Sequence, residues 1–255
     1  MLDLAVLVDV PSLIIVLGAS FVSSFILYTK VKPALDLCSK TILGVGCLGA
    51  QIGLVQALAQ VSSPDVLLLV SVIIVIPMLY AGVGYALVST SPVSHPNPVG
   101  SIPLFRKLAS LIALVGVFLW AILVVPEASF FDPLALIVFF AFVVIFGVIN
   151  KGKNGNINFL KVAYNTLVMS VVWSSAGLLG AIARYADPTQ IGPFLGFAVL
   201  LSTYATSLCI LVEFFYAMTQ RERDVNLNFG WQEFLLVGAV SIVVPITLIL
   251  GTVQR

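Results

Sequence analysis

The sequence predicts an all-α, polytopic membrane helix bundle with about eight transmembrane helices. Of its 255 residues, 60% are hydrophobic and only 9% are charged, whereas an ordinary soluble domain carries about 25% charged residues. The apolar residues form long runs with short polar segments between them. A run of about 18 or more is long enough to cross the hydrocarbon layer as a helix, so the composition and the run lengths both point to the bilayer.

The apolar runs also place the expected helices. They lie at residues 11–29, 39–61, 66–89, 107–125, 132–149, 161–183, 193–218 and 231–251. The connections between them are too short to fold as soluble domains.

Lysine and arginine residues predict the orientation of this bundle. With eight crossings, ten of the twelve fall on one side, and the positive-inside rule makes that side cytoplasmic. Both termini are then expected outside the cytoplasm. The ten are Lys30, Lys32, Lys40, Arg106, Lys107, Lys151, Lys153, Lys161, Arg221 and Arg223, and the other two are Arg184 and Arg255.

An internal repeat appears when the sequence is shifted by 124 residues. The helices at 11–29, 39–61 and 66–89 then match those at 132–149, 161–183 and 193–218 in the same orientation, so the repeats are parallel. The recurring pairs include Gly53 and Gly177, Leu54 and Leu178, Pro64 and Pro188, Tyr80 and Tyr204, Ala81 and Ala205, and, at a shift of 123, Asp9 and Asp132.

The repeat predicts four segments. They are a first repeat of three helices (1–90), a cytoplasmic linker (91–104), a second repeat of four helices (105–224) and a C-terminal transmembrane helix (225–255). Because this last helix runs outward and ends where the helix at 11–29 begins, we expect the two to lie side by side, with the C-terminal helix completing the first repeat.

Each repeat carries a line of small residues on one helix face, because a spacing of three or four residues returns to the same side of a helix. Small faces let helix backbones approach closely in lipid. Packing within the chain, a groove for a partner helix and a polar lining for an ion all remain open. The lines are Gly46, Ala50, Gly53 and Ala57 in the first repeat, and Ser170, Ser174, Gly177 and Ala181 in the second.

Several segments of the repeats resemble a known family. They are VDVPSLIIVLGAS (8–20), GCLGAQIGLVQALAQVSSPD (46–65), PMLYAG (77–82) and SSAGLLGAIARYADPTQIGPFLGFAVLLSTYA (174–205). They resemble the MotA/TolQ/ExbB family, most closely the MotA/PomA subunit of bacterial flagellar stators, over nearly all the membrane helices.

The resemblance implies a four-helix unit that oligomerises around the helix of a single-span B-type partner and conducts protons or sodium in the bacterial inner membrane. Both termini would then be periplasmic. By motif position, the family's hydroxyl residue on its third helix falls on Ala50 and Ser174, and its proline falls on Leu43 and Leu167. Only the second repeat keeps hydroxyls. The expected ion-path or partner-helix face is therefore Ser170, Ser174, Gly177, Ala181, Ser202 and Thr203.

The chain also departs from the family. It lacks the large cytoplasmic domain that transmits torque, because the matching connections are short. Its one acid well inside an expected span is Glu213, a candidate intramembrane acid; an interfacial Glu213 paired with Arg221 or Arg223 is the alternative.

No set of residues in the sequence suggests catalysis. A nucleophile, a base and an orienting group do not converge, and the cysteines and His95 have no metal-site spacing. We therefore expect no enzyme activity, no cofactor, no metal and no nucleic-acid partner. Besides membrane lipid, the expected partners are a single-span B-type protein or other motor membrane proteins, with a homo-oligomer as an open alternative.

The sequence thus predicts a noncatalytic membrane subunit of a stator-like, flagellar motor-associated, ion-driven complex. Ion conduction is expected only with a partner. Two alternatives stay open: a secondary transporter with parallel repeats, and a structural or assembly membrane protein.

Overall fold

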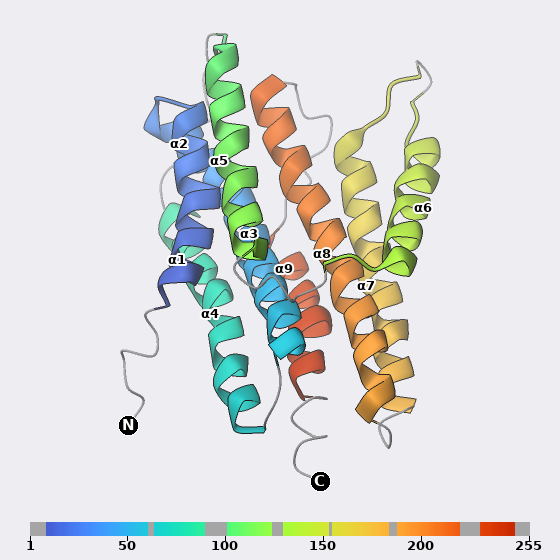
Figure 1. The fold of residues 1–255 in the computed structure, drawn as a ribbon. Helices are drawn as coiled ribbons and strands as arrows, with labels where there is room; N and C mark the ends of the chain where they lie inside the picture. The colour runs from blue at the N-terminus through green and yellow to red at the C-terminus, as the bar shows by residue number, and fades with distance from the viewer. Residues whose placement is uncertain are drawn as a thin grey trace.

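The structure, a computed structural model, describes residues 9–60, 64–89, 101–123, 130–152, 155–183, 188–219 and 230–247 (Figure 1). These residues are almost entirely helical and contain no β-strand, which confirms the all-α prediction. The helices are α1 (Val10–Val16), η2 (Leu17–Val22), α2 (Ser23–Leu27), α3 (Val31–Gln60), α4 (Pro64–Ser89), α5 (Leu104–Leu123), α6 (Pro133–Ile149), α7 (Phe159–Ala183), α8 (Pro188–Thr219), α9 (Trp231–Gly238) and η3 (Ala239–Val243), where η2 and η3 are π-helical.

Among the described residues, five helices are long and apolar enough to cross a membrane. They are Val10–Leu27, Val31–Gln56, Leu104–Leu123, Phe159–Ala183 and Pro193–Thr219. Two further apolar helices, Ile74–Ser89 and Pro133–Ile149, are shorter. These helices indicate a multi-pass membrane protein, and the count of eight crossings stays a prediction.

Two helix pairs form the centre of the bundle, α3 with α4 and α7 with α8. Glycines let the first pair approach closely. A Cβ atom at Gly46 would overlap the Cβ of Ala81 and lie 2.9 Å from the carbonyl oxygen of Pro77. In the second pair, a Cβ at Gly177 would lie 3.1 Å from the carbonyl oxygen of Phe194. Small residues therefore set the distance between the axes of both pairs.

The helices that flank these pairs begin in the same way. Asp9 caps α1 by accepting a hydrogen bond from the Ser12 amide at 2.9 Å, and Asp132 caps α6 by accepting from the amides of Leu134 and Ala135. Each cap residue satisfies amides that a helix N-terminus leaves without an intrahelical partner. α1 then packs against α3 and α4, and α6 packs against α7 and α8.

Each cap is also tied to a tyrosine of the neighbouring helix. The Asp9 amide donates to the hydroxyl of Tyr80 on α4 at 3.2 Å. The Asp132 amide donates to the hydroxyl of Tyr204 on α8 at 3.4 Å. The Tyr204 hydroxyl in turn donates to the carbonyl of Phe130 at 2.7 Å. The same bond thus joins corresponding elements in the two parts of the chain.

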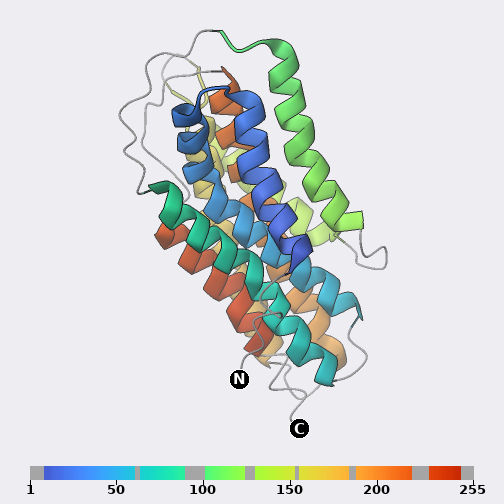
Figure 2. The same ribbon diagram turned by 90° about the vertical axis from the view of Figure 1, so that its left-hand side faces the viewer.

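The helix beside α1, η2 and α2 is α5, as Figures 1 and 2 show. Ser110 of α5 donates to the carbonyl oxygen of Ser23 at 2.7 Å, and a Cβ at Gly18 would lie 3.0 Å from Val117. This differs from the sequence-based expectation, which placed the C-terminal helix there. A buried serine that reaches a backbone carbonyl gives α5 a polar contact with the first span.

The C-terminal helix comprises α9, η3 and the helical residues 244–247. Its main contacts are with α3, α7 and α8, and a Cβ at Gly238 would overlap Met78 of α4. It therefore lies between the two helix pairs. The residues 248–255, which would end beside Asp9, lie outside the described part.

All seven described lysines and arginines lie at or near one end of the bundle, where α2 meets α3, α5 begins and α6 turns into α7 (Figures 1 and 2). They are Lys30, Lys32, Lys40, Arg106, Lys107, Lys151 and Lys161. We call this the basic end.

The close approach of α3 and α4 predicts the effect of adding one methyl group. Gly46→Ala should destabilise the protein by about 1–3 kcal/mol, because the new Cβ overlaps Ala81 and the helices must separate. Gly116→Ala on α5 is the matched control, because its Cβ would meet no atom within 4 Å. It should be neutral or stabilise by up to about 1 kcal/mol through helix propensity. Thermal unfolding in detergent measures both, and equal midpoints would contradict this packing.

Candidate functional site

A buried line of polar side chains runs between α3, α7 and α8, and we call it the polar seam. Its members are Gln51 on α3, Thr166, Ser170 and Ser174 on α7, and Ser202 and Thr206 on α8, all with 0% of their surface exposed. Spacings of four residues put the α7 members on one helix face and the α8 members on another. The seam thus forms where α8 packs against both other helices.

One half of the seam is closed by hydrogen bonds. The Ser174 hydroxyl donates to the carbonyl oxygen of Ala198 at 2.7 Å. The Ser202 hydroxyl lies 2.9 Å from the carbonyl oxygen of Val199, and Gln51 Nε2 donates to the Ser202 oxygen at 3.4 Å. These bonds connect α7 to α8 and α8 to α3, so this part of the seam holds three helices together.

The other half has hydroxyls without protein partners. Thr166 Oγ1 and Ser170 Oγ are buried and make no hydrogen bond with any described group. A buried polar group left this way costs about 1–3 kcal/mol, and in native proteins it commonly marks the place of an ordered water or ion. The seam is therefore best suited to hold a small polar species beside Thr166 and Ser170.

The structure brings together most of the expected face of the second repeat. Ser170, Ser174, Ala181 and Ser202 each have 0% exposure, and the Gly177 position meets Ala198 at 3.2 Å. The face is covered by the chain's own helices. Its small residues pack α7 on α8, and no part of it lies on the outer surface of this chain.

Thr203 does not belong to this group. It is 6% exposed, and its hydroxyl donates to the carbonyl oxygen of Val199 at 2.7 Å. Because it follows Ser202 directly, it points about 100° away around the helix, and it lines a cavity beside α5 together with Ile52 and Leu114. The sequence-based expectation that Thr203 shares the face of Ser202 is therefore wrong.

The small face of the first repeat packs in the matching way. Ala50 is fully buried, and a Cβ at Gly53 would lie 3.6 Å from Ile74 of α4. Residues 53 and 74 correspond to 177 and 198 at the shift of 124, so the same contact occurs twice. The side chain of Ala57 lies outside the described part.

The acid Glu213 lies on the seam side of α8. It is 1% exposed and follows Ser202 and Thr206 by eleven and seven residues, spacings that stay on one helix face. Glu233 of the C-terminal helix accepts a hydrogen bond from the Gly230 amide at 2.9 Å. Glu213 and Glu233 thus come from separate helices, α8 and the C-terminal helix.

The C-terminal helix packs against both helix pairs. Phe234 and Val237 belong to the same buried cluster as Ala50 and Ala205. Val240 and Val244 pack against a second cluster, formed by Leu178, Ala181, Leu195 and Ala198. The carbonyl of Phe234 accepts a weak bond from the Cys47 thiol at 3.8 Å. The space between α3, α4, α7 and α8, which we call the helix slot, is thus filled by this helix.

Sequence reasoning missed three contributors to this site. Gln51 shows in the sequence only as a polar residue within an apolar run, although its amide joins two helices. Thr206 follows Ser202 by four residues, a spacing that would have identified it. No sequence pattern around Glu233 predicts its position, because that position depends on how the C-terminal helix packs.

Metal chemistry has no basis in the described residues. They contain no group of three or more His, Cys, Asp or Glu side chains that could hold a metal ion. Cys38, Cys47 and Cys209 are buried free thiols.

Comparison with known proteins gives no relative, because no family model, curated protein or solved structure matches the chain. The resemblance to stator subunits therefore rests on the sequence segments alone.

The two halves of the seam predict opposite effects of removing one hydroxyl. Ser174→Ala should lower the free energy of unfolding by about 1 kcal/mol, because it removes the bond to Ala198. Ser170→Ala should leave stability unchanged or raise it, because the lost hydroxyl has no protein partner. Unfolding in detergent compares the two variants. A loss at Ser170 as large as that at Ser174 would mean that a bound species satisfies this hydroxyl.

Proposed function

We propose that the chain is a noncatalytic membrane subunit of a stator-like, motor-associated, ion-driven complex, built from two parallel MotA-like repeats. The first repeat comprises α1 to α4 with η2, and the second comprises α5 to α8, of which α6 to α8 correspond to the first repeat. The observation that carries the proposal is the helix slot: two corresponding helix pairs, each held together by a face of small residues, with one further membrane helix packed between them.

The repeat is supported by contacts as well as by sequence. The Asp9 to Tyr80 and Asp132 to Tyr204 bonds join corresponding residues. Each flanking helix, α1 or α6, packs on the corresponding pair. The two helix pairs meet where α3 contacts α8.

The helix slot fits the role that the resemblance implies. In the MotA-like family, A-type subunits surround the membrane helix of a B-type partner. Here the chain's own C-terminal helix lies between the two helix pairs. We infer that this helix takes the place of a partner helix, so a separate partner contacts the chain elsewhere on its membrane surface.

Ion conduction is secondary in this proposal. The family's proline positions hold Leu43 and Leu167, which are 0% and 1% exposed, and no torque domain is present. What supports an ion role is the unpartnered pair Thr166 and Ser170, with Glu213 toward the basic end. The same buried polar groups support a secondary transporter as the second candidate. Flux into proteoliposomes that contain this chain alone would favour the transporter.

The proposed topology has eight crossings in the bacterial inner membrane with both termini periplasmic. All seven described basic side chains lie at or near one end of the bundle, which is the cytoplasmic end by the positive-inside rule. A reporter that is active only in the periplasm should be active after Arg255 and inactive after Lys151. Activity of a cytoplasm-specific reporter after Arg255 would contradict the topology.

The complex itself is tested by purification in mild detergent with identification of the co-purifying membrane proteins. We expect a single-span protein with an intramembrane carboxylate, and recovery of none would contradict the proposal.

A second experiment fixes the C-terminal helix in the slot by a cross-link between cysteines introduced at Met78 and Gly238. A cross-link between cysteines at Ser23 and Ser110 is the matched control outside the slot. Both variants are made in a chain without the three native cysteines.

Partner recovery should be unchanged by either cross-link, because the slot is already filled. Loss of the partner only with the cross-link between positions 78 and 238 would mean that the partner displaces the C-terminal helix, and would overturn the inferred substitution.

A further inference from the structure

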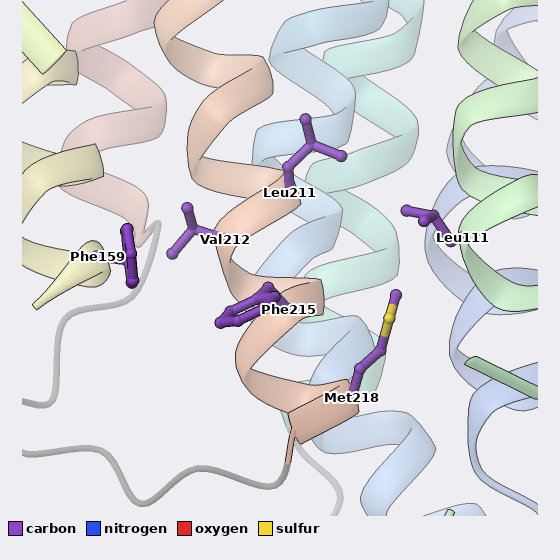
Figure 3. A pocket seen from close by; sticks show the side chains of 6 residues that line it. All are labelled: Leu111, Phe159, Leu211, Val212, Phe215 and Met218. Atoms are coloured by element: carbon purple, nitrogen blue, oxygen red, sulfur yellow. The ribbon is translucent and has the colours of Figure 1, made fainter. Parts of the chain in front are cut away.

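A groove opens to the membrane surface between α5 and α8. α5 packs against the first span and makes few contacts with α8, so two cavities remain between them. The one nearer the basic end has a volume of about 340 Å³ and is lined by Leu111, Phe159, Leu211, Val212, Phe215 and Met218 (Figure 3). The other, of about 260 Å³, reaches α3 at Leu48 and Ile52. The cavities share Leu211, and together we call them the lateral groove.

The walls of the groove are large, apolar and partly open. Leu211 and Phe215 are 43% and 45% exposed. In Figure 3, Leu111 and Met218 extend toward each other from opposite walls. The floor is α3, and Phe118 and Ile122 continue the α5 wall toward the far end. The groove therefore runs along the depth of the bilayer, with hydrocarbon-like walls for most of its length.

Among the described residues, a lysine lies at one end of this groove. Lys107 precedes Leu111 by four residues, so it lies on the groove side of α5 one turn closer to the basic end, and its side chain is half-buried. The neighbouring Arg106 is turned the other way, since its Nη1 donates to Thr29 Oγ1 at 3.3 Å. The far end, at Ile122 and Phe130, has no described lysine or arginine near it.

We propose that the lateral groove binds one phospholipid with an anionic head group, whose acyl chain lies along α8 and whose phosphate lies against Lys107. This goes beyond the proposed function, because it assigns a ligand to a surface that neither repeat uses. Basic positions between transmembrane helices on the cytoplasmic side are known to suit acidic lipid head groups. Here the apolar cavity would contact the acyl chain, and Lys107 at its end would contact the phosphate of the head group.

The shape and chemistry of the groove favour an acyl chain over a helix as its occupant. A spanning helix is about 10 Å across and 30 Å long, so only part of one of its sides would fit into cavities of about 340 and 260 Å³. Helices in lipid also associate through small residues, as they do at Gly46 and Gly177. The groove is instead lined by leucine, phenylalanine and methionine, which suit a flexible hydrocarbon chain.

Native mass spectrometry of the full chain tests the proposal with phosphatidylglycerol and phosphatidylcholine of identical acyl chains. The wild type should retain one phosphatidylglycerol in preference to phosphatidylcholine. Lys107→Gln should lower the affinity for phosphatidylglycerol about five-fold, since one basic group near the membrane surface contributes about 1 kcal/mol, and should leave phosphatidylcholine unaffected. Arg106→Gln is the matched control and should change neither.

A second variant blocks the groove without touching the core. Leu211→Trp fills the junction of the two cavities and should abolish retention of both lipids. Ile137→Trp, at a site on α6 with 67% exposure, should retain them. Thermal unfolding checks that each variant is folded. Lipid retention by Leu211→Trp equal to that of the wild type would overturn the site. Equal losses of affinity for phosphatidylglycerol in Lys107→Gln and Arg106→Gln would also overturn it.

A photoreactive benzophenone residue at position 211 identifies the occupant in cell membranes. A lipid adduct is expected. An adduct with another protein, or with a second copy of this chain, would assign the groove to that partner and overturn the lipid proposal.

Discussion

Close approach of helix backbones is the constraint on which the rest of the structure depends. In a bilayer, helices gain little from burying apolar surface against each other, since lipid is as apolar as leucine; van der Waals contact must hold them together instead. At Gly46 against Ala81, and at Gly177 against Phe194 and Ala198, the contacts are tight enough that even one added Cβ must shift a neighbour. The distances set by these glycines and alanines define two helix pairs, and the distance between the pairs leaves the slot for one more helix.

Satisfying polar groups is the second constraint, and it acts differently at the two ends of the bundle. At the end opposite the lysines, Asp9 and Asp132 cap their helices and each amide reaches a tyrosine hydroxyl. Inside the bundle, Ser174 and Ser202 share the carbonyl of Ala198. The hydroxyls of Thr166 and Ser170 have no such hydrogen bonds, so the free-energy cost of their desolvation remains. A water molecule or ion bound there would offset this cost.

The sequence predicts the helices well and their neighbours poorly, for a physical reason. Apolar runs and short polar breaks place most described helices close to their expected positions, although α3 begins at Val31, eight residues before the expected residue 39. The spacing of Gly46, Ala50 and Gly53 identifies a face that packs. A small face, however, accepts any helix of suitable shape. Nothing local distinguishes α5 from the C-terminal helix as the neighbour of the first span, because that choice depends on contacts such as Ser110 with the carbonyl of Ser23. The role of Gln51 is hidden for the same reason, since its partner lies 151 positions away.

Covalent connection explains why the chain fills its own slot. A tethered helix meets its binding surface at an effective concentration of the order of millimolar, so a free partner helix must bind far more tightly to displace it. The C-terminal helix also has a shape adapted to this place: the π-helical turn at Ala239–Val243 precedes Pro245, and a wider turn accommodates a proline, which has no amide hydrogen to donate. In the proposed complex, this covalent connection would fix the ratio of the two repeats to the helix between them. Further subunits of that complex would then bind at the outer surface, where α5 and α6 face the lipid.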